Sequence, residues 1–180
     1  IYTQEARHNG HYHHLDLINR ARLCGSVEAL IQEAGLKDGI LRAAQGKGIP
    51  IVLAGSIPNT LPDDIYERIM AHLAGRGIRI VVDATKNLLR RVLKYRPFLI
   101  KPNNHELGEM FGVTLKTDDE IIEHAKRLQD EGATNVLISM AGDGAILLTA
   151  EGVFYRSAAP KGTLVNSVGA GDSMVAGFLA

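Results

Sequence analysis

The chain has 180 residues, which is the length of about one domain and enough for a single layered core. Twenty Lys and Arg residues balance twenty Asp and Glu residues, so the chain lacks the strong positive charge that favours nucleic acid or anionic membranes, and we expect neither as a partner. Hydrophobic residues make up 46% of the chain, as in ordinary globular proteins, and no apolar run approaches the roughly 20 residues of a membrane span. The single cysteine, Cys24, excludes an intrachain disulfide and favours a reducing, cytoplasmic location.

The first 48 residues differ from the rest of the chain. Residues 1–25 show no sustained periodicity, and the histidines among them have no carboxylate or cysteine framework that would fix the geometry of a metal site. A helix is predicted from about Ser26, which suits an N-cap position. The chain begins without an initiator Met or a signal peptide and stops within an apolar helical pattern, so we expect a fragment that is truncated at both ends.

From Ile49 onward, short apolar runs alternate with amphipathic segments. The runs are rich in β-branched residues and are apolar at successive positions, as in strands that helices cover on both faces. Alternation of such strands with helices predicts βαβ units and a mainly parallel sheet in an α/β fold. The predicted strands span residues 49–55, 78–84, 98–102 and 135–141.

Two helices and a hairpin are predicted among and after these strands. The segment 61–75 has a proline and two aspartates near its start and ends in glycine, while the segment 117–132 is acidic at its start and also ends in glycine. Residues 144–149 and 152–157 are separated only by Ala-Glu, which predicts an antiparallel hairpin at the end of the sheet.

A turn of small residues near the C-terminus is the most informative segment. Gly169, Ala170 and Gly171 precede an apolar helix, so that successive backbone N–H groups lie at the positive end of its dipole and form an anion cradle. Asp172 opens the helix; its charge disfavours simple phosphate binding but suits a residue that accepts a proton from a hydroxyl group attacking the phosphate. The alternative is that Asp172 only caps the helix, and the residues alone leave both interpretations open.

Residues 101–107, Lys-Pro-Asn-Asn-His-Glu-Leu, follow a predicted strand at the end where open α/β sheets bind their ligands. Asn103 and Glu106 have the spacing of a capping box, which is the simpler interpretation. The functional alternative places Glu106 near a magnesium ion, through water because Mg²⁺ gives up its hydration reluctantly. Lys101 either neutralises phosphate charge or extends its ammonium group from the strand end into solvent.

A glycine-bracketed turn follows the fourth predicted strand. Ser139 and the backbone amides of Ala141, Gly142 and Gly144 would line a nucleotide phosphate or ribose there, although a tight connection without a ligand is the simpler interpretation. Asp83, at the end of the second predicted strand, is interpreted as the cap of the helix that follows, with a ligand contact as the alternative.

Taken together, these motifs resemble the ribokinase-like sugar kinases of the PfkB type, and among them the bacterial 1-phosphofructokinases. The resemblance covers roughly residues 49–180, which we interpret as a partial kinase domain. It rests on four segments that follow one another in the family's order: AGSIP (54–58), KPNNHEL (101–107), SMAGDGA (139–145) and NSVGAGDSMVAGF (166–178).

The resemblance implies a three-layer α/β/α fold and ATP-dependent phosphorylation of fructose 1-phosphate to fructose 1,6-bisphosphate. Asp172 matches the family's catalytic base, and residues 169–171 match its anion hole. Asn103 and Glu106 match the Asn-x-x-Glu pair that organises magnesium and phosphate, and residues 139–144 match the nucleotide-binding loop. ATP and Mg²⁺ are therefore the expected cofactors.

The region that binds the sugar in this family is not found in the sequence, which leaves the acceptor open. Tagatose-6-phosphate kinase is the alternative activity, because it shares these motifs. A catalytically silent nucleotide-binding fragment is the alternative from a different class, and we expect weak or no turnover from these 180 residues alone. A homodimer of the full-length protein also stays open, because the strands that often form the family's dimer clasp belong to the region not found here.

Overall fold

The computed structural model describes residues 45–46, 48, 50–55, 63–163 and 169–180. Within them, six strands form one sheet whose spatial order is the order of the sequence. The first four strands are parallel, whereas the pairs β4–β5 and β5–β6 are antiparallel. The strands are β1 (Ile51–Ala54), β2 (Ile80–Asp83), β3 (Leu99–Ile100), β4 (Asn135–Ser139), β5 (Ala145–Leu148) and β6 (Phe154–Ser157).

All four predicted strands and the predicted hairpin are confirmed. The hairpin turns where the Gly152 N–H donates to the Thr149 carbonyl at 2.9 Å, and Gly152 adopts φ +76°, a conformation that favours glycine. Strand β3 ends at Ile100, before the end of the predicted run 98–102, where Pro102 has no N–H to donate to a ladder.

The helices of the described residues connect and cover the strands. The predicted helices at 61–75 and 117–132 are confirmed as α4 and α7, although residues 61 and 62 lie outside the described residues. A capping box begins α7, because the Thr117 hydroxyl accepts from the Glu120 N–H at 3.2 Å and the Glu120 carboxylate accepts from the Thr117 N–H at 3.1 Å. The α-helices are α4 (Ile65–Leu73), α5 (Lys86–Val92), α6 (Asn104–Phe111), α7 (Asp118–Asp130) and α8 (Ala170–Leu179), with 3₁₀ turns η1 (Leu93–Tyr95) and η2 (Ala141–Asp143).

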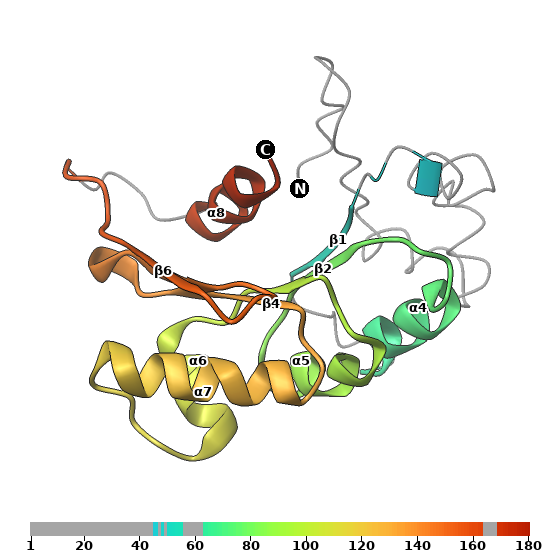
Figure 1. Cartoon of the computed structure of the whole chain (residues 1–180), viewed down its shortest axis with the longest axis horizontal. Coiled ribbons are helices and arrows are strands. Elements are labelled where there is room, and N and C mark those ends of the chain that lie inside the picture. Colours follow the sequence, from blue (N-terminus) through green and yellow to red (C-terminus); the bar gives the residue numbers. More distant parts are fainter. Residues whose placement is uncertain (1–44, 47, 49, 56–62, 164–168) are drawn as a thin grey trace.

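The helices form one layer on each face of the sheet. In Figure 1, α4, α5, α6 and α7 lie against one face and α8 lies against the other. Side chains of β2 alternate between these faces: Ile80 and Val82 join the core under α4–α7, while Val81 belongs to a second cluster with Val175 of α8. The three-layer α/β/α architecture is therefore confirmed.

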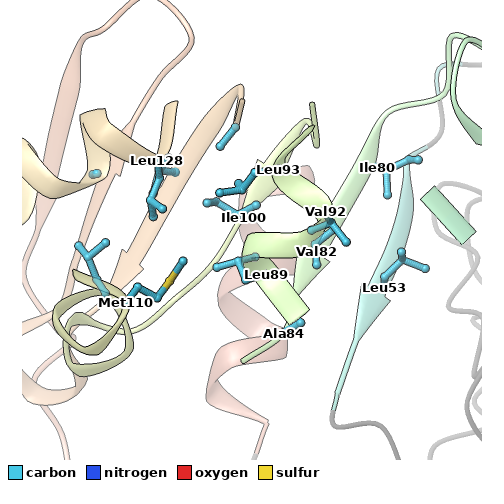
Figure 2. Packing of buried hydrophobic residues seen from close by; sticks show 14 of the residues in the cluster. Leu53, Ile80, Val82, Ala84, Leu89, Val92, Leu93, Ile100, Met110 and Leu128 are labelled. Atoms are coloured by element: carbon cyan, nitrogen blue, oxygen red, sulfur yellow. The ribbon is translucent and has the colours of Figure 1, made fainter. Parts of the chain in front are cut away.

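The larger core lies between the sheet and α4–α7. Figure 2 shows Leu89 and Val92 of α5 beside Val82 of β2, and all three side chains are fully buried. This close packing holds α5 against the sheet. No helix in the described part of the chain has the length and apolar character needed to span a membrane.

Several predictions concern residues outside those that the structure describes. The start of the helix expected from Ser26, the lone Cys24 and the histidines of residues 1–25 all lie within residues 1–44. Residues 164–168, which lead into the small-residue turn, are also outside the described residues.

Candidate active site

Two neighbouring parallel strands place an ion pair at their carboxyl ends. Asp83 is the last residue of β2, and Lys101 directly follows β3. Because Val82 pairs with Ile100, the residues that follow them lie side by side, and Lys101 Nζ lies 3.2 Å from Asp83 Oδ1. The Lys101 side chain is only 9% exposed. The interpretation in which its ammonium group extends into solvent is therefore wrong.

Asp83 does not cap the helix that follows it, which corrects the simpler interpretation from the sequence. The N-cap of α5 is Thr85, and no side-chain hydrogen bond caps this helix. The Asp83 carboxylate pairs with Lys101 instead. The signal that identifies this pair is nonlocal, because it requires knowing that β2 and β3 are neighbours and that the carboxyl ends of parallel strands meet at one edge.

The small-residue turn forms the N-terminus of α8. Gly169 is the N-cap with φ +81°, and the helix begins at Ala170, two residues before the position that the sequence indicated. Asp172 is therefore the third helical residue, and no side chain caps the helix, so the interpretation of Asp172 as a cap is wrong. The N–H groups of residues 169–172 have no acceptor within the helix, and such a helix N-terminus favours an anion.

Gly171 brings this helix end onto the ion pair. A Cβ atom at position 171 would lie 3.0 Å from Lys101 Nζ and 3.8 Å from Asp83 Oδ2. A larger residue would therefore have to displace the lysine. Asp172, the next residue, is exposed to solvent, and its negative charge acts on Asp83. The carboxylate of Asp172 thus stands at the same edge of the sheet as the ion pair.

The capping box predicted at the start of α6 is confirmed. Asn103 Oδ1 accepts a hydrogen bond from the Glu106 N–H at 2.8 Å, and Glu106 Oε2 accepts one from the Asn103 N–H at 2.9 Å. A parallel bridge between Asn103 and Ser139 aligns this helix start with the end of β4. The Glu106 carboxylate is half-buried, and its charge also acts on Asp83.

Negative charge accumulates around Asp83. Burial raises the pKa of its carboxyl above the ordinary value of 3.8; Lys101 opposes this effect, and Asp172 and Glu106 add to it. Three carboxylates therefore share the electrostatic environment of one buried ammonium group. This excess of negatively charged oxygen ligands fits a divalent cation such as Mg²⁺. Among the described residues, no three His, Cys, Asp or Glu side chains form a direct metal site.

The raised pKa of Asp83 predicts how stability depends on pH. The folded state holds this proton more tightly than the unfolded state, so between the ordinary pKa of 3.8 and the higher folded value the free energy of unfolding falls as pH rises. Urea denaturation from about pH 4 to about pH 6 should show wild type losing stability relative to Asp83→Asn. The exposed Asp119→Asn is the matched control. A constant or growing advantage of wild type over Asp83→Asn would contradict the prediction.

The predicted nucleotide loop connects β4 to β5. The Met140 N–H donates to the Gly144 carbonyl at 2.8 Å and the Gly144 N–H donates to the Ala141 carbonyl at 3.1 Å, which closes the loop. Ala141 adopts φ +48°, a left-handed conformation that costs a non-glycine residue about 1–2 kcal/mol. At Gly144, with φ +93°, a Cβ atom would lie 2.0 Å from the Ser157 carbonyl oxygen. The loop is therefore strained and pressed closely against β6.

The sequence predicted that Ser139 and the backbone amides of Ala141, Gly142 and Gly144 line a ligand. The structure differs from this prediction at Gly144. Because the Gly144 N–H is engaged, Gly144 shapes the loop rather than presenting a free amide. The N–H groups of Ala141 and Gly142 donate to no other group within the part of the chain that the structure describes, and both residues are exposed. Ser139 is half-buried at the end of β4. Two amides and one hydroxyl are thus available.

Comparison with known proteins identifies the family. Residues 27–180 match the model of the pfkB family carbohydrate kinases. Over 134 residues the chain is 51% identical to a 1-phosphofructokinase of Bacillus subtilis strain 168, and the match covers 74% of this chain and 44% of that protein. Over 152 residues it is 37% identical to a D-tagatose-1-phosphate kinase of Bacillus licheniformis, covering 83% of this chain and 50% of that protein.

A solved structure shares the fold. Phosphofructokinase-2 from Escherichia coli, in complex with fructose-6-phosphate, matches with a TM-score of 0.69 and 26% identity, covering 81% of this chain and 47% of that chain. The chain spans about half the length of these relatives. Since the family model matches most of its residues, the chain belongs to the pfkB family of carbohydrate kinases.

Proposed function

We propose that the chain supplies the catalytic and nucleotide-binding parts of an ATP-dependent sugar-phosphate kinase that converts fructose 1-phosphate to fructose 1,6-bisphosphate. One observation carries this proposal: an uncapped helix N-terminus, an exposed carboxylate and a buried ion pair converge at one edge of the sheet. Phosphoryl transfer to an alcohol requires such groups, which position the reactants and stabilise the charge on the transferring phosphoryl group. The similarity to a 1-phosphofructokinase supports fructose 1-phosphate as the acceptor.

Asp172 is the proposed catalytic base. It accepts the proton of the acceptor's primary hydroxyl group while the hydroxyl oxygen attacks the γ-phosphorus of ATP in line. The bond from the γ-phosphorus to the β–γ bridging oxygen breaks as the new P–O bond forms, and ADP leaves. A carboxylate is a weak base for an alcohol, so positioning and electrostatics supply most of the acceleration, and proton transfer contributes about 10²–10⁴-fold.

The N-terminus of α8 is proposed to stabilise the charge on the transferring group. The amides of residues 169–171 have no acceptor within the helix, and donors fixed in advance cost no reorganisation when the charge develops. Lys101 adds a positive charge beside Gly171, and Asp83 holds its ammonium group in place. The close approach at Gly171 therefore combines backbone donors and a cation in one subsite.

The residues at this edge also fit magnesium and the nucleotide. Glu106 would hold Mg²⁺ through water, and the capping box with Asn103 fixes the orientation of its carboxylate. When bound, Mg²⁺ neutralises phosphate charge. Ser139 and the amides of Ala141 and Gly142 are proposed to bind a phosphate or the ribose of ATP.

Two alternatives lead to different measurements. The similarity to a D-tagatose-1-phosphate kinase favours a tagatose phosphate as a second candidate acceptor, with tagatose 6-phosphate as the alternative from the motifs. The share of its relatives that the chain covers favours a nucleotide-binding fragment without turnover.

We further propose that the complete protein is a cytoplasmic homodimer.

The test uses the protein encoded by the complete reading frame that contains this sequence. Assayed with Mg·ATP, it should give a kcat/KM for fructose 1-phosphate at least about tenfold above that for tagatose 6-phosphate or D-tagatose 1-phosphate. Calorimetric titration of the 180-residue chain with Mg·ATP, paired with a phosphoryl-transfer assay, separates binding from turnover. Failure of the complete protein to phosphorylate any of the three sugars would rule out the proposed activity.

A further inference from the structure

The nucleotide loop is tied to two other elements by a single guanidinium group. Arg156 lies on β6, where it pairs with Ile146 of β5. Its Nη1 donates to the Asp143 carbonyl at 2.6 Å and to the Ser157 carbonyl at 3.0 Å, while its Nε donates to Asp118 Oδ2 at 2.8 Å. Arg156 therefore joins the loop η2, the edge strand and the first residue of α7.

The anchor for this guanidinium group is itself fixed. Asp118 is the first helical residue of α7, directly after the N-cap Thr117, and the capping box with Glu120 holds this helix end in place. A carboxylate at a helix N-terminus is also favoured by the helix dipole. Because the fixed Asp118 carboxylate accepts from Nε, the guanidinium group of Arg156 is oriented so that Nη1 donates to the Asp143 carbonyl.

The loop needs such a restraint. Ala141 adopts a left-handed conformation, which persists only where the surroundings compensate for its cost. The close contact between Gly144 and Ser157 fixes the end of the loop at β5. The bond to Asp143 restrains the residue between these two points, next to the free amides of Ala141 and Gly142.

We propose that Arg156 is a positioning residue that sets the affinity for the nucleotide by holding the backbone amides of the loop in their binding arrangement. The inference rests on the proposed function, because it assumes that this loop binds ATP. Arg156 acts through the Asp143 carbonyl and not by touching the substrate. Its loss should therefore weaken nucleotide binding, while the acceptor site and the base at α8 keep their properties.

The experiment compares Arg156→Gln with wild type in the protein encoded by the complete reading frame. Loss of a charge-assisted hydrogen bond should raise the KM for Mg·ATP, and the calorimetric Kd for the non-hydrolysable analogue Mg·AMP-PNP, by about tenfold. The kcat and the KM for fructose 1-phosphate should stay within about twofold of wild type. A general structural defect would instead change all four quantities.

Further variants keep the inference testable if Arg156→Gln folds poorly. Arg156→Lys keeps a positive charge but lacks the planar guanidinium group that bonds the Asp143 carbonyl and the Asp118 carboxylate together. An intermediate rise in the KM for Mg·ATP is therefore expected. Asp118→Asn removes the anchor and should raise this KM by about threefold. Arg68→Gln removes a comparable exposed arginine, which pairs with Asp64 on α4 at 3.3 Å, and should leave every constant unchanged.

The outcomes separate this inference from the proposed function. If wild type and Arg68→Gln bind Mg·AMP-PNP normally and the Arg156 variants bind it equally well, the positioning role is overturned while the kinase proposal stands. A parallel change of kcat and of both KM values in the Arg156 variants would also overturn it. If wild type itself binds no Mg·AMP-PNP and transfers no phosphoryl group, both proposals fail together.

Discussion

In the protein encoded by the complete reading frame, Asp172→Asn is expected to lower kcat by about 10²–10⁴-fold. The amide cannot accept the hydroxyl proton, so the acceptor oxygen must attack without general-base assistance. Binding of Mg·ATP should persist or become slightly tighter, because the exposed negative charge at the N-terminus of α8 is removed. Steady-state kinetics with fructose 1-phosphate and calorimetry with Mg·AMP-PNP measure the two effects separately.

A matched control removes the same charge from the same kind of position. Asp119 lies exposed in the first turn of α7, as Asp172 does in α8, so Asp119→Asn loses a similar interaction with a helix dipole. Its kcat should stay within about twofold of wild type. Near-normal kcat in Asp172→Asn would eliminate the assignment of this residue as the base.

Lys101→Met is expected to lower the free energy of unfolding by about 2–4 kcal/mol. The substitution leaves Asp83 largely buried without its cation, while Glu106 and Asp172 continue to repel it. Protonation of Asp83 limits the loss, because burial already raises the pKa of this carboxyl. A loss of this size is a large fraction of the stability of an ordinary domain, and urea denaturation measures it directly.

The double variant identifies the cause of that loss. Adding Asp83→Asn to Lys101→Met removes the unpaired charge and should recover about half of the lost stability. The exposed pair of Arg68 and Asp64 supplies the comparison, since Arg68→Gln should cost less than about 1 kcal/mol. The buried-pair account fails if Lys101→Met costs no more than Arg68→Gln, or if the double variant is less stable than Lys101→Met alone.

Local patterns in the sequence were sufficient to predict most of the described fold. The β-branched runs predicted β1 to β4, and the short polar break predicted the hairpin of β5 and β6. The capping box at Asn103 and Glu106 was also predicted, because its partners are three residues apart. Each of these signals lies within one element or one turn.

Features that depend on neighbouring strands could not be predicted in the same way. The pairing of Asp83 with Lys101 depends on the register of β2 against β3. The hydrogen bond from Arg156 to Asp118 joins residues that are 38 positions apart in the sequence. The start of α8 was misplaced because Gly169 and Asp172 are both residue types found at helix N-termini. The roles of the site residues in binding and catalysis stay predictions until the variants are measured.

The agreement between strand order and sequence order has a consequence for synthesis. Each strand from β2 to β6 pairs with the strand made just before it, so the sheet can grow one strand at a time as the polypeptide leaves the ribosome. The helices α4 to α7 are translated between these strands and can cover one face along the way. Among the described elements, α8 follows all six strands in the sequence, and it carries Asp172 over the opposite face. During synthesis, the described strands and the helices α4 to α7 therefore precede the residue proposed to perform chemistry.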